Sequence, residues 1–343
     1  MFVTLSLFPP CCCYNGRMTG ETPNQDAQTQ AFLQLGPDAI LAAVEQAGYA
    51  CDGHILPLNS YENRVYQVGI CEQAPVVVKF YRPVRWSDEQ ILEEHHFTQE
   101  LADHELSVIA PLADAAGITL HHAGVFRFAI YPRTGGRPPE LDAKEHLTQL
   151  GRLLARIHAS GATRSFVFRT AISVQHHGIE PGRYLLAHGF IPPDLEPAYR
   201  TLCDDLIVRI QHCFDRAGNF RKIRLHGDCH HGNILWRDHT PWLLDFDDAQ
   251  SGPAVQDLWM LLSGDRPYMT ARLEELLEGY TEFYDFDPRE LHLIEALRTL
   301  RMMHHAGWIA RRWHDRAFPL AFPYFNTHHY WQEHILTLRE QAA

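Results

Sequence analysis

The sequence contains no apolar run near the ~18 residues that a membrane-spanning helix needs, so we expect no membrane insertion. It is also poor in positive charge, because 30 Lys and Arg stand against 42 Asp and Glu and give a formal net charge of −12. An acidic surface favours solubility and opposes nonspecific binding to nucleic acid. Neither a membrane nor a nucleic acid is therefore expected as a partner.

The eight cysteines lack the paired CxxC spacing of a zinc site, and three of them, Cys11, Cys12 and Cys13, are consecutive. Consecutive cysteines cannot easily serve a disulfide framework, so free thiols in a reducing cytoplasm are expected. The 23 histidines are scattered or stand in adjacent pairs, whose side chains point about 100° apart on a helix. A dedicated histidine metal site is therefore not favoured.

Patterns typical of strands come first, and patterns typical of helices follow. A β-branched run ends in aromatic residues at 76–81, and Ser87 with Gln90 three positions later predicts the start of a helix. Residues 132–139 are rich in Gly and Pro and are the natural linker, and apolar residues recur at helical spacing over 143–160.

These patterns predict an α+β fold with a boundary in the linker. Residues 1–34 are interpreted as a disordered tail, within which Met18 is an alternative start of translation. Residues 35–132 are expected to form a lobe built on an antiparallel sheet, and residues 133–343 a larger, mainly helical lobe.

The most informative spacing is that of Asp228, Asn233 and Asp245. A carboxylate such as Asp228 can orient an acceptor hydroxyl and take its proton. The Asn233 amide and the Asp245 carboxylate, five and seventeen positions later, are oxygen ligands that suit Mg²⁺ held against nucleotide phosphates. A polar turn with surface acids is the alternative. We favour phosphoryl transfer.

Four residues before this segment bear on a nucleotide site. Lys79 closes the strand at 76–78 and can reach phosphates as a point charge, with Glu94 on the next helix as its ion-pair partner. Glu93 stays open as an alternative partner. Ser60 lies in the turn at 59–63, where a phosphate-covering loop would stand, although this turn is not glycine-rich and an ordinary hairpin turn is as good an interpretation.

Several neighbours keep two interpretations. A structural His226 is favoured over a catalytic acid, and Cys229 is interpreted as a bystander thiol. Asp257 either occupies the first turn of a helix or braces the amides of the Asp228 loop. Asp247 and Asp248 either support the metal ligands or are solvated or structural.

The segments 57–66, 78–83, 91–95, 225–237 and 252–262 resemble the protein-kinase-like superfamily in its choline kinase/aminoglycoside phosphotransferase branch. They are most similar to the bacterial stress response kinase A family. The resemblance implies a two-lobed protein-kinase-like fold and a monomer in the cytoplasm. It also implies that γ-phosphoryl groups pass from ATP, with Mg²⁺, to serine or threonine hydroxyls of proteins during envelope and oxidative stress.

The same resemblance implies roles for individual residues. Asp228 would be the proton acceptor, Asp245 would be catalytic, and Asn233 and Asp245 would hold the metal. Ser60, Lys79 and Glu94 would belong to the ATP site in the first lobe, with residues 129–132 as the hinge against adenine. The second lobe would bind the acceptor.

One departure from eukaryotic protein kinases affects regulation. Asp245-Phe246-Asp247 stands where they have Asp-Phe-Gly, and no activation loop with Ala-Pro-Glu follows, so activation-loop phosphorylation is not expected. A small-molecule alcohol kinase of the choline, homoserine or aminoglycoside type and a nucleotide-binding pseudokinase remain alternatives. Four aromatic residues could line either an aromatic cage for a small alcohol such as choline or an open groove for a peptide: Trp259, Trp308, Trp313 and Tyr330.

Overall fold

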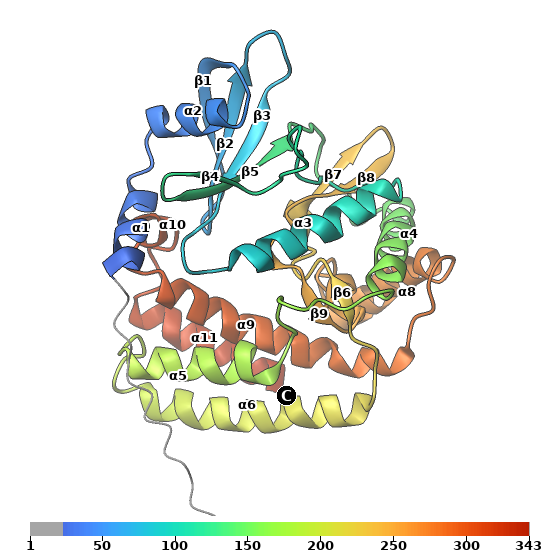
Figure 1. Ribbon diagram of the computed structural model, residues 1–343. Coiled ribbons are helices and arrows are strands. Elements are labelled where there is room, and N and C mark those ends of the chain that lie inside the picture. Colours follow the sequence, from blue (N-terminus) through green and yellow to red (C-terminus); the bar gives the residue numbers. More distant parts are fainter. Residues whose placement is uncertain (1–22, 343) are drawn as a thin grey trace, which may run out of the picture.

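The computed structural model describes residues 23–342, and its first lobe is built on a five-stranded antiparallel sheet in the order β1-β2-β3-β5-β4. The strands are β1 (Cys51–Leu58), β2 (Arg64–Ile70), β3 (Val76–Phe80), β4 (His121–Ala123) and β5 (Phe126–Pro132). Figure 1 shows this sheet on one side of the molecule and most helices on the other. The predicted α+β arrangement with a sheet-based first lobe is confirmed.

Successive side chains of the central strand β3 point to opposite faces of the sheet. Val78 and Phe80 are buried in a core shared with α2 (Pro37–Gln46). Lys79 points to the opposite face, where its cross-strand partner Ala129 packs with Ile91 of α3 (Asp88–Asp103). A strand with period two thus places one lysine on the face that looks towards the helical lobe.

Helix α1 (Pro23–Leu33) lies in the segment predicted to be a disordered tail, so that prediction is wrong over these residues. Phe32 is 1% exposed, and the guanidinium groups of Arg64 and Arg82 lie 5.1 and 5.2 Å from its ring centroid. Cation–π contacts and burial of one aromatic ring hold this polar helix against the first lobe. Residues 1–22, with Met18 and the consecutive cysteines, lie outside the described residues.

The second lobe is mainly helical, as predicted. Its helices are α4 (Lys144–Gly161), α5 (Glu180–Ala187), α6 (Glu196–Ala217), α7 (Val255–Trp259), α8 (Arg266–Tyr280), α9 (Ile294–Arg311), α10 (Ala317–Ala321) and α11 (His328–Ala342). Helices α4 and α8 touch through glycines, since a Cβ at Gly151 would lie 2.0 Å from the Leu276 carbonyl oxygen. Within residues 23–342, every helix is too short or too polar to cross a membrane.

Two short antiparallel pairs interrupt the helices: β6 (Ile223–Leu225) with β9 (Gln250–Gly252), and β7 (Ile234–Arg237) with β8 (Thr240–Leu243). The linker pairs with β7, because Arg137 and Trp236 exchange two backbone hydrogen bonds of 3.0 and 2.7 Å. Val108 forms a bridge to Leu243 of β8. The Val108 bridge thus joins the β7–β8 hairpin to the first lobe, and the Arg137 pairing joins it to the linker.

Candidate active site

The loop that carries Asp228 is held in place by the side chain of Asp257. This carboxylate is fully buried and accepts hydrogen bonds from the backbone N–H groups of His226 and Gly227, each at 2.9 Å. His158 Nε2 lies 3.1 Å from the same carboxylate. Asp257 lies in the first turn of α7 and also braces the loop, so the structure shows both interpretations.

Gly227 allows this loop to pass close to the segment after β8. Its φ is +85°, and a Cβ there would lie 2.2 Å from the Asp248 carbonyl oxygen. An L-residue is therefore disfavoured both by the backbone conformation and by the contact. The glycine brings Asp228 beside the segment that contains Asp245.

His226 links the same two segments and has the structural role that the sequence favours. Its Nε2 lies 2.9 Å from the Leu244 carbonyl oxygen, and the Asp228 N–H donates to its Nδ1 at 3.3 Å. Both contacts fit a neutral ring protonated on Nε2. The neighbouring Cys229 is fully buried, which raises the pKa of its thiol well above the ordinary value and agrees with a bystander.

The β7–β8 hairpin places the two expected metal ligands side by side. Asn233 precedes β7 and Asp245 follows β8 after one residue, and the Leu244 N–H donates to the Asn233 carbonyl at 3.1 Å. Asn233 Nδ2 donates to the Asp228 carbonyl at 3.0 Å, which leaves its Oδ1 able to bind a cation. Asp245 has a left-handed backbone, with φ +62°, and a side chain that is 45% exposed.

Amide and carboxylate oxygens on adjacent backbone segments suit Mg²⁺, which takes few protein ligands and completes its shell with phosphates and water. The residues present therefore fit the expected ion. A left-handed conformation at a residue other than glycine costs about 1 kcal/mol and is common at functional sites.

Lys79 reaches this pair of ligands from the sheet. Its Nζ lies 2.6 Å from Asp245 Oδ1 and 3.9 Å from the Asp247 carboxylate. Burial acts to lower the pKa of Lys79, but the charges of Asp245 and Asp247 outweigh it and the pKa is raised well above its ordinary value. The ammonium is therefore charged at neutral pH.

Glu94 and Glu93 are separated by the helix, as expected. Glu94 is buried, which raises its pKa to about 7, and its closest cationic contact is Arg169, at 4.0 Å. Lys79 lies against Asp245 rather than Glu94 in this conformation, so the Lys79–Glu94 pair stays a prediction. Glu93 accepts hydrogen bonds from the backbone N–H groups of residues 167–169 and braces that loop.

Arg85 joins the site although no sequence motif points to it. Its two terminal nitrogens pair with the carboxylates of Asp247 and Asp248, and Asn63 Nδ2 donates to Asp247 at 3.0 Å. Asp247 is almost fully buried, and although burial opposes ionisation, Arg85 and Lys79 hold its pKa well below the usual range. Asp247 is thus a structural anion that joins the two lobes.

The turn at 59–63 is fixed to the helical lobe by an interlobe ion cluster. This cluster consists of Glu62, Arg64, Arg82, Arg312 and Asp315. Glu62 lies 3.1 Å from Arg82 and 2.6 Å from Arg312, and Asp315 lies 2.6 Å from Arg82 and 3.1 Å from Arg64. The turn therefore has a packing role beside any contact with phosphates.

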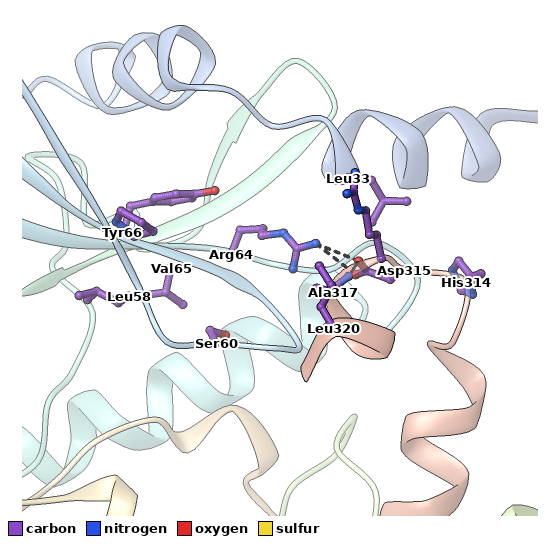
Figure 2. A pocket seen from close by; sticks show the side chains of 12 residues that line it. Leu33, Leu58, Ser60, Arg64, Val65, Tyr66, His314, Asp315, Ala317 and Leu320 are labelled. Atoms are coloured by element: carbon purple, nitrogen blue, oxygen red, sulfur yellow. Dashed lines mark hydrogen bonds and ion pairs between the residues drawn. The ribbon is translucent and has the colours of Figure 1, made fainter. Parts of the chain in front are cut away.

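Ser60 lines a cavity of about 500 Å³ between the β1–β2 hairpin, α1 and α10 (Figure 2). The lining includes Leu58, Arg64, Asp315 and Leu320, whereas Lys79 and Asp245 are not part of it. The structure thus brings Asp228, Asn233, Asp245 and Lys79 together and places Ser60 on a different hollow. A role of Ser60 at an ATP site stays a prediction.

The aromatic residues considered for an acceptor pocket pack mostly with other rings. Trp308 donates to Glu62 and contacts Phe318, with ring centroids 4.9 Å apart. Trp313 and Tyr330 both lie against the buried Phe325, at 5.2 and 5.0 Å.

Asp228 itself is contacted by two basic side chains. Arg301 of α9 lies 2.6 Å from Oδ1, and His230 Nε2 lies 3.4 Å from Oδ2. Burial acts to raise the pKa of Asp228, but His230 and Arg301 outweigh it and hold the pKa well below the usual range. Asp228 is therefore ionised at neutral pH, as the predicted proton acceptor must be. No spacing in the sequence pointed to Arg301.

Comparisons with known proteins agree with this geometry. The model of the phosphotransferase enzyme family matches residues 54–294. Stress response kinase A of Escherichia coli K12 is 44% identical over 311 residues, which cover 91% of this chain and 94% of that protein. Serine/threonine protein kinase RdoA of Salmonella typhimurium is 43% identical with the same coverage.

Solved structures share the fold at low identity. Amicoumacin kinase hAmiN, in complex with AMP-PNP, Ca²⁺ and Ami, has a TM-score of 0.68 at 18% identity, with 90% of this chain and 96% of that chain covered. A microcompartment-associated aminopropanol kinase has a TM-score of 0.66 at 18% identity, with 89% and 95% covered. The chain therefore belongs to the phosphotransferase enzyme family and, within it, to the stress response kinase A family.

Proposed function

We propose that this protein is a kinase that transfers the γ-phosphoryl group of ATP to serine or threonine hydroxyls of proteins in a bacterial stress response. The observation that carries the proposal is the meeting of Asp228, Asn233 and Asp245 at one end of the β7–β8 hairpin, with Lys79 Nζ 2.6 Å from Asp245. Relatives at 43–44% identity are named stress response kinase A and serine/threonine protein kinase.

In the reaction, the acceptor oxygen attacks the γ-phosphorus while the bond from this phosphorus to the leaving oxygen of ADP breaks. Asp228 accepts a hydrogen bond from the attacking hydroxyl and takes its proton late in the transfer. Lys79, which is charged, offsets negative charge on the phosphates. Mg²⁺ bound to Asn233 and Asp245 would supply further positive charge at the phosphate oxygens.

Each lobe would have its own role in the reaction. Residues 35–132 would bind the nucleotide, and residues 133–343 would supply Asp228 and the acceptor surface. We further propose that the protein is a monomer in the cytoplasm. Its cysteines are interpreted as free thiols, and no sequence pattern demands a partner subunit.

A transfer assay tests the proposal. The purified protein is incubated with γ-³²P-labelled ATP, Mg²⁺ and a lysate separated by size into a protein fraction and a small-molecule fraction. We expect label on proteins with the wild type and none with Asp228→Asn. Label confined to small molecules would instead establish an alcohol kinase, and ATP binding with no transfer to either fraction would establish a pseudokinase.

A further inference from the structure

Arg301 contacts Asp228, the carboxylate to which the proposed function brings the acceptor hydroxyl. It projects from α9 onto Asp228 Oδ1 at 2.6 Å, and its side chain is 41% exposed while that of Asp228 is 21% exposed. A hydroxyl that approaches the carboxylate therefore approaches the guanidinium as well. Arg301 lies on the acceptor side of the reaction.

Other cations of the site are already committed to other carboxylates. Lys79 lies against Asp245, and Arg85 bridges Asp247 and Asp248. Among residues 23–342, Asp228 is the ion-pair partner of Arg301. When Asp228 turns to the acceptor hydroxyl, the guanidinium loses part of this interaction and can pair with a new anion.

The buried rings near Arg301, those of His177, His304 and His305, do not add a second fixed charge. The ring of His230 lies on the other oxygen of Asp228, Oδ2, at 3.4 Å. Burial, together with nearby cations that include Arg301, lowers the pKa of His177 to about 4, and the pKa of His304 is lowered well below its ordinary value for the same reasons. Burial and Arg301 also lower the pKa of His305 to about 4, so all three rings are neutral at pH 7. An anionic group on the acceptor would thus be recognised by Arg301, whose planar fork of donors suits a carboxylate.

We propose that Arg301 selects acceptors that carry an acidic side chain, Asp or Glu, next to the hydroxyl that is phosphorylated. This inference rests on the proposed function. It runs against the general field of the molecule, because a net charge of −12 favours basic partners. An acidic preference would therefore have to come from a local cation.

Three serine peptides that differ only in the residues beside the serine, Glu, Gln or Lys, test the proposal. Their alanine counterparts, which cannot be phosphorylated, give Kd values by isothermal titration without any turnover. We expect the wild type to prefer the Glu peptide over the Gln peptide about tenfold in Kd and in kcat/KM. Arg301→Gln should abolish this preference through KM while the KM for ATP stays unchanged, and Arg301→Lys should restore part of it.

Arg200→Gln is the matched control, since Arg200 makes a single exposed ion pair of 2.6 Å with Glu196 on α6. Equal Kd values for the three alanine peptides in the wild type would overturn the proposal. So would an Arg301→Gln enzyme that gains rate equally with all three serine peptides, because Arg301 would then only restrain Asp228. If peptides bind with the expected preference but the lysate assay labels no protein, the protein-kinase proposal fails and the acidic selectivity stands.

Discussion

Replacing Asp257 with asparagine perturbs the brace under the Asp228 loop in a way that can be quantified. The carboxylate has two backbone N–H donors at 2.9 Å, from His226 and Gly227, and a His158 ring nitrogen at 3.1 Å. An asparagine offers one acceptor oxygen, so in either orientation its NH₂ group faces at least one backbone N–H. A buried donor without an acceptor costs about 1–3 kcal/mol, and a charge-assisted bond is weakened in addition. We expect a loss of about 2–4 kcal/mol in the free energy of unfolding.

Asp257→Asn should lower kcat by more than the loss of folded protein alone would explain. A displacement of Asp228 by about 1 Å lowers turnover about 100-fold, because the hydroxyl is no longer aligned with the phosphorus. Urea denaturation gives the free energy of unfolding, and steady-state kinetics at a temperature where the variant is folded give kcat and the KM for ATP. The KM for ATP should change little.

Asp265→Asn is the control, because Asp265 accepts the Tyr268 N–H at 2.9 Å at the exposed start of α8, where asparagine caps equally well. Wild-type values of both the urea midpoint and kcat for Asp257→Asn would refute the reasoning about the brace.

Four further outcomes are expected. Asp228→Ala should abolish transfer with ATP still bound in a titration, and residual transfer near the wild-type rate would contradict the assigned proton acceptor. Asp245→Ala should weaken Mg²⁺-dependent ATP binding at least tenfold, so an unchanged Mg²⁺ requirement would exclude it as a ligand. Gly227→Ala should unfold at lower urea than the wild type, because its Cβ would meet the Asp248 carbonyl at 2.2 Å; an unchanged midpoint would contradict the close approach. Burial and nearby cations lower the pKa of His95 to about 3. The unfolded chain takes up a proton near pH 6.5, so this side chain's contribution to stability is present above that pH and falls by about 2 kcal/mol from pH 7 to pH 5. Urea titrations at several pH values should show this loss of free energy of unfolding, and His95→Gln should reduce it. An equal pH dependence of the free energy of unfolding in the wild type and the variant would contradict the assignment.

The parts that could be predicted from the sequence are those set by short-range patterns. The β-branched run that ends in aromatic residues at 76–81 predicted the strand that carries Lys79, and the Ser87–Gln90 capping box predicted the start of α3; the structure confirms both. The hairpin between Asn233 and Asp245 follows from two apolar runs around a polar turn, and its closure brings the two predicted ligands together.

What could not be predicted depends on contacts between distant segments. Arg85 meets Asp247 162 positions later, and no local spacing marks such a pair. Arg301 is one of several arginines on a helix until α9 packs beside the Asp228 loop. The helix at 23–33 has a polar sequence, and its order comes from Phe32 beneath two arginines of the first lobe rather than from its own periodicity.

The interlobe ion cluster has a mechanical consequence. Glu62 of the hairpin turn and Arg82 after β3 are buried against Arg312 and Asp315 of the helical lobe. A wide rotation about the linker would separate these charges, and breaking a buried ion pair costs several kcal/mol. Wide opening of the two lobes should therefore be rare, and the nucleotide exchange that the proposed function requires should proceed through small local movements of the strands between the hairpin turn and the linker. The two lobes are thus joined at the hairpin turn as well as at the linker, and they cannot rotate freely about the linker alone.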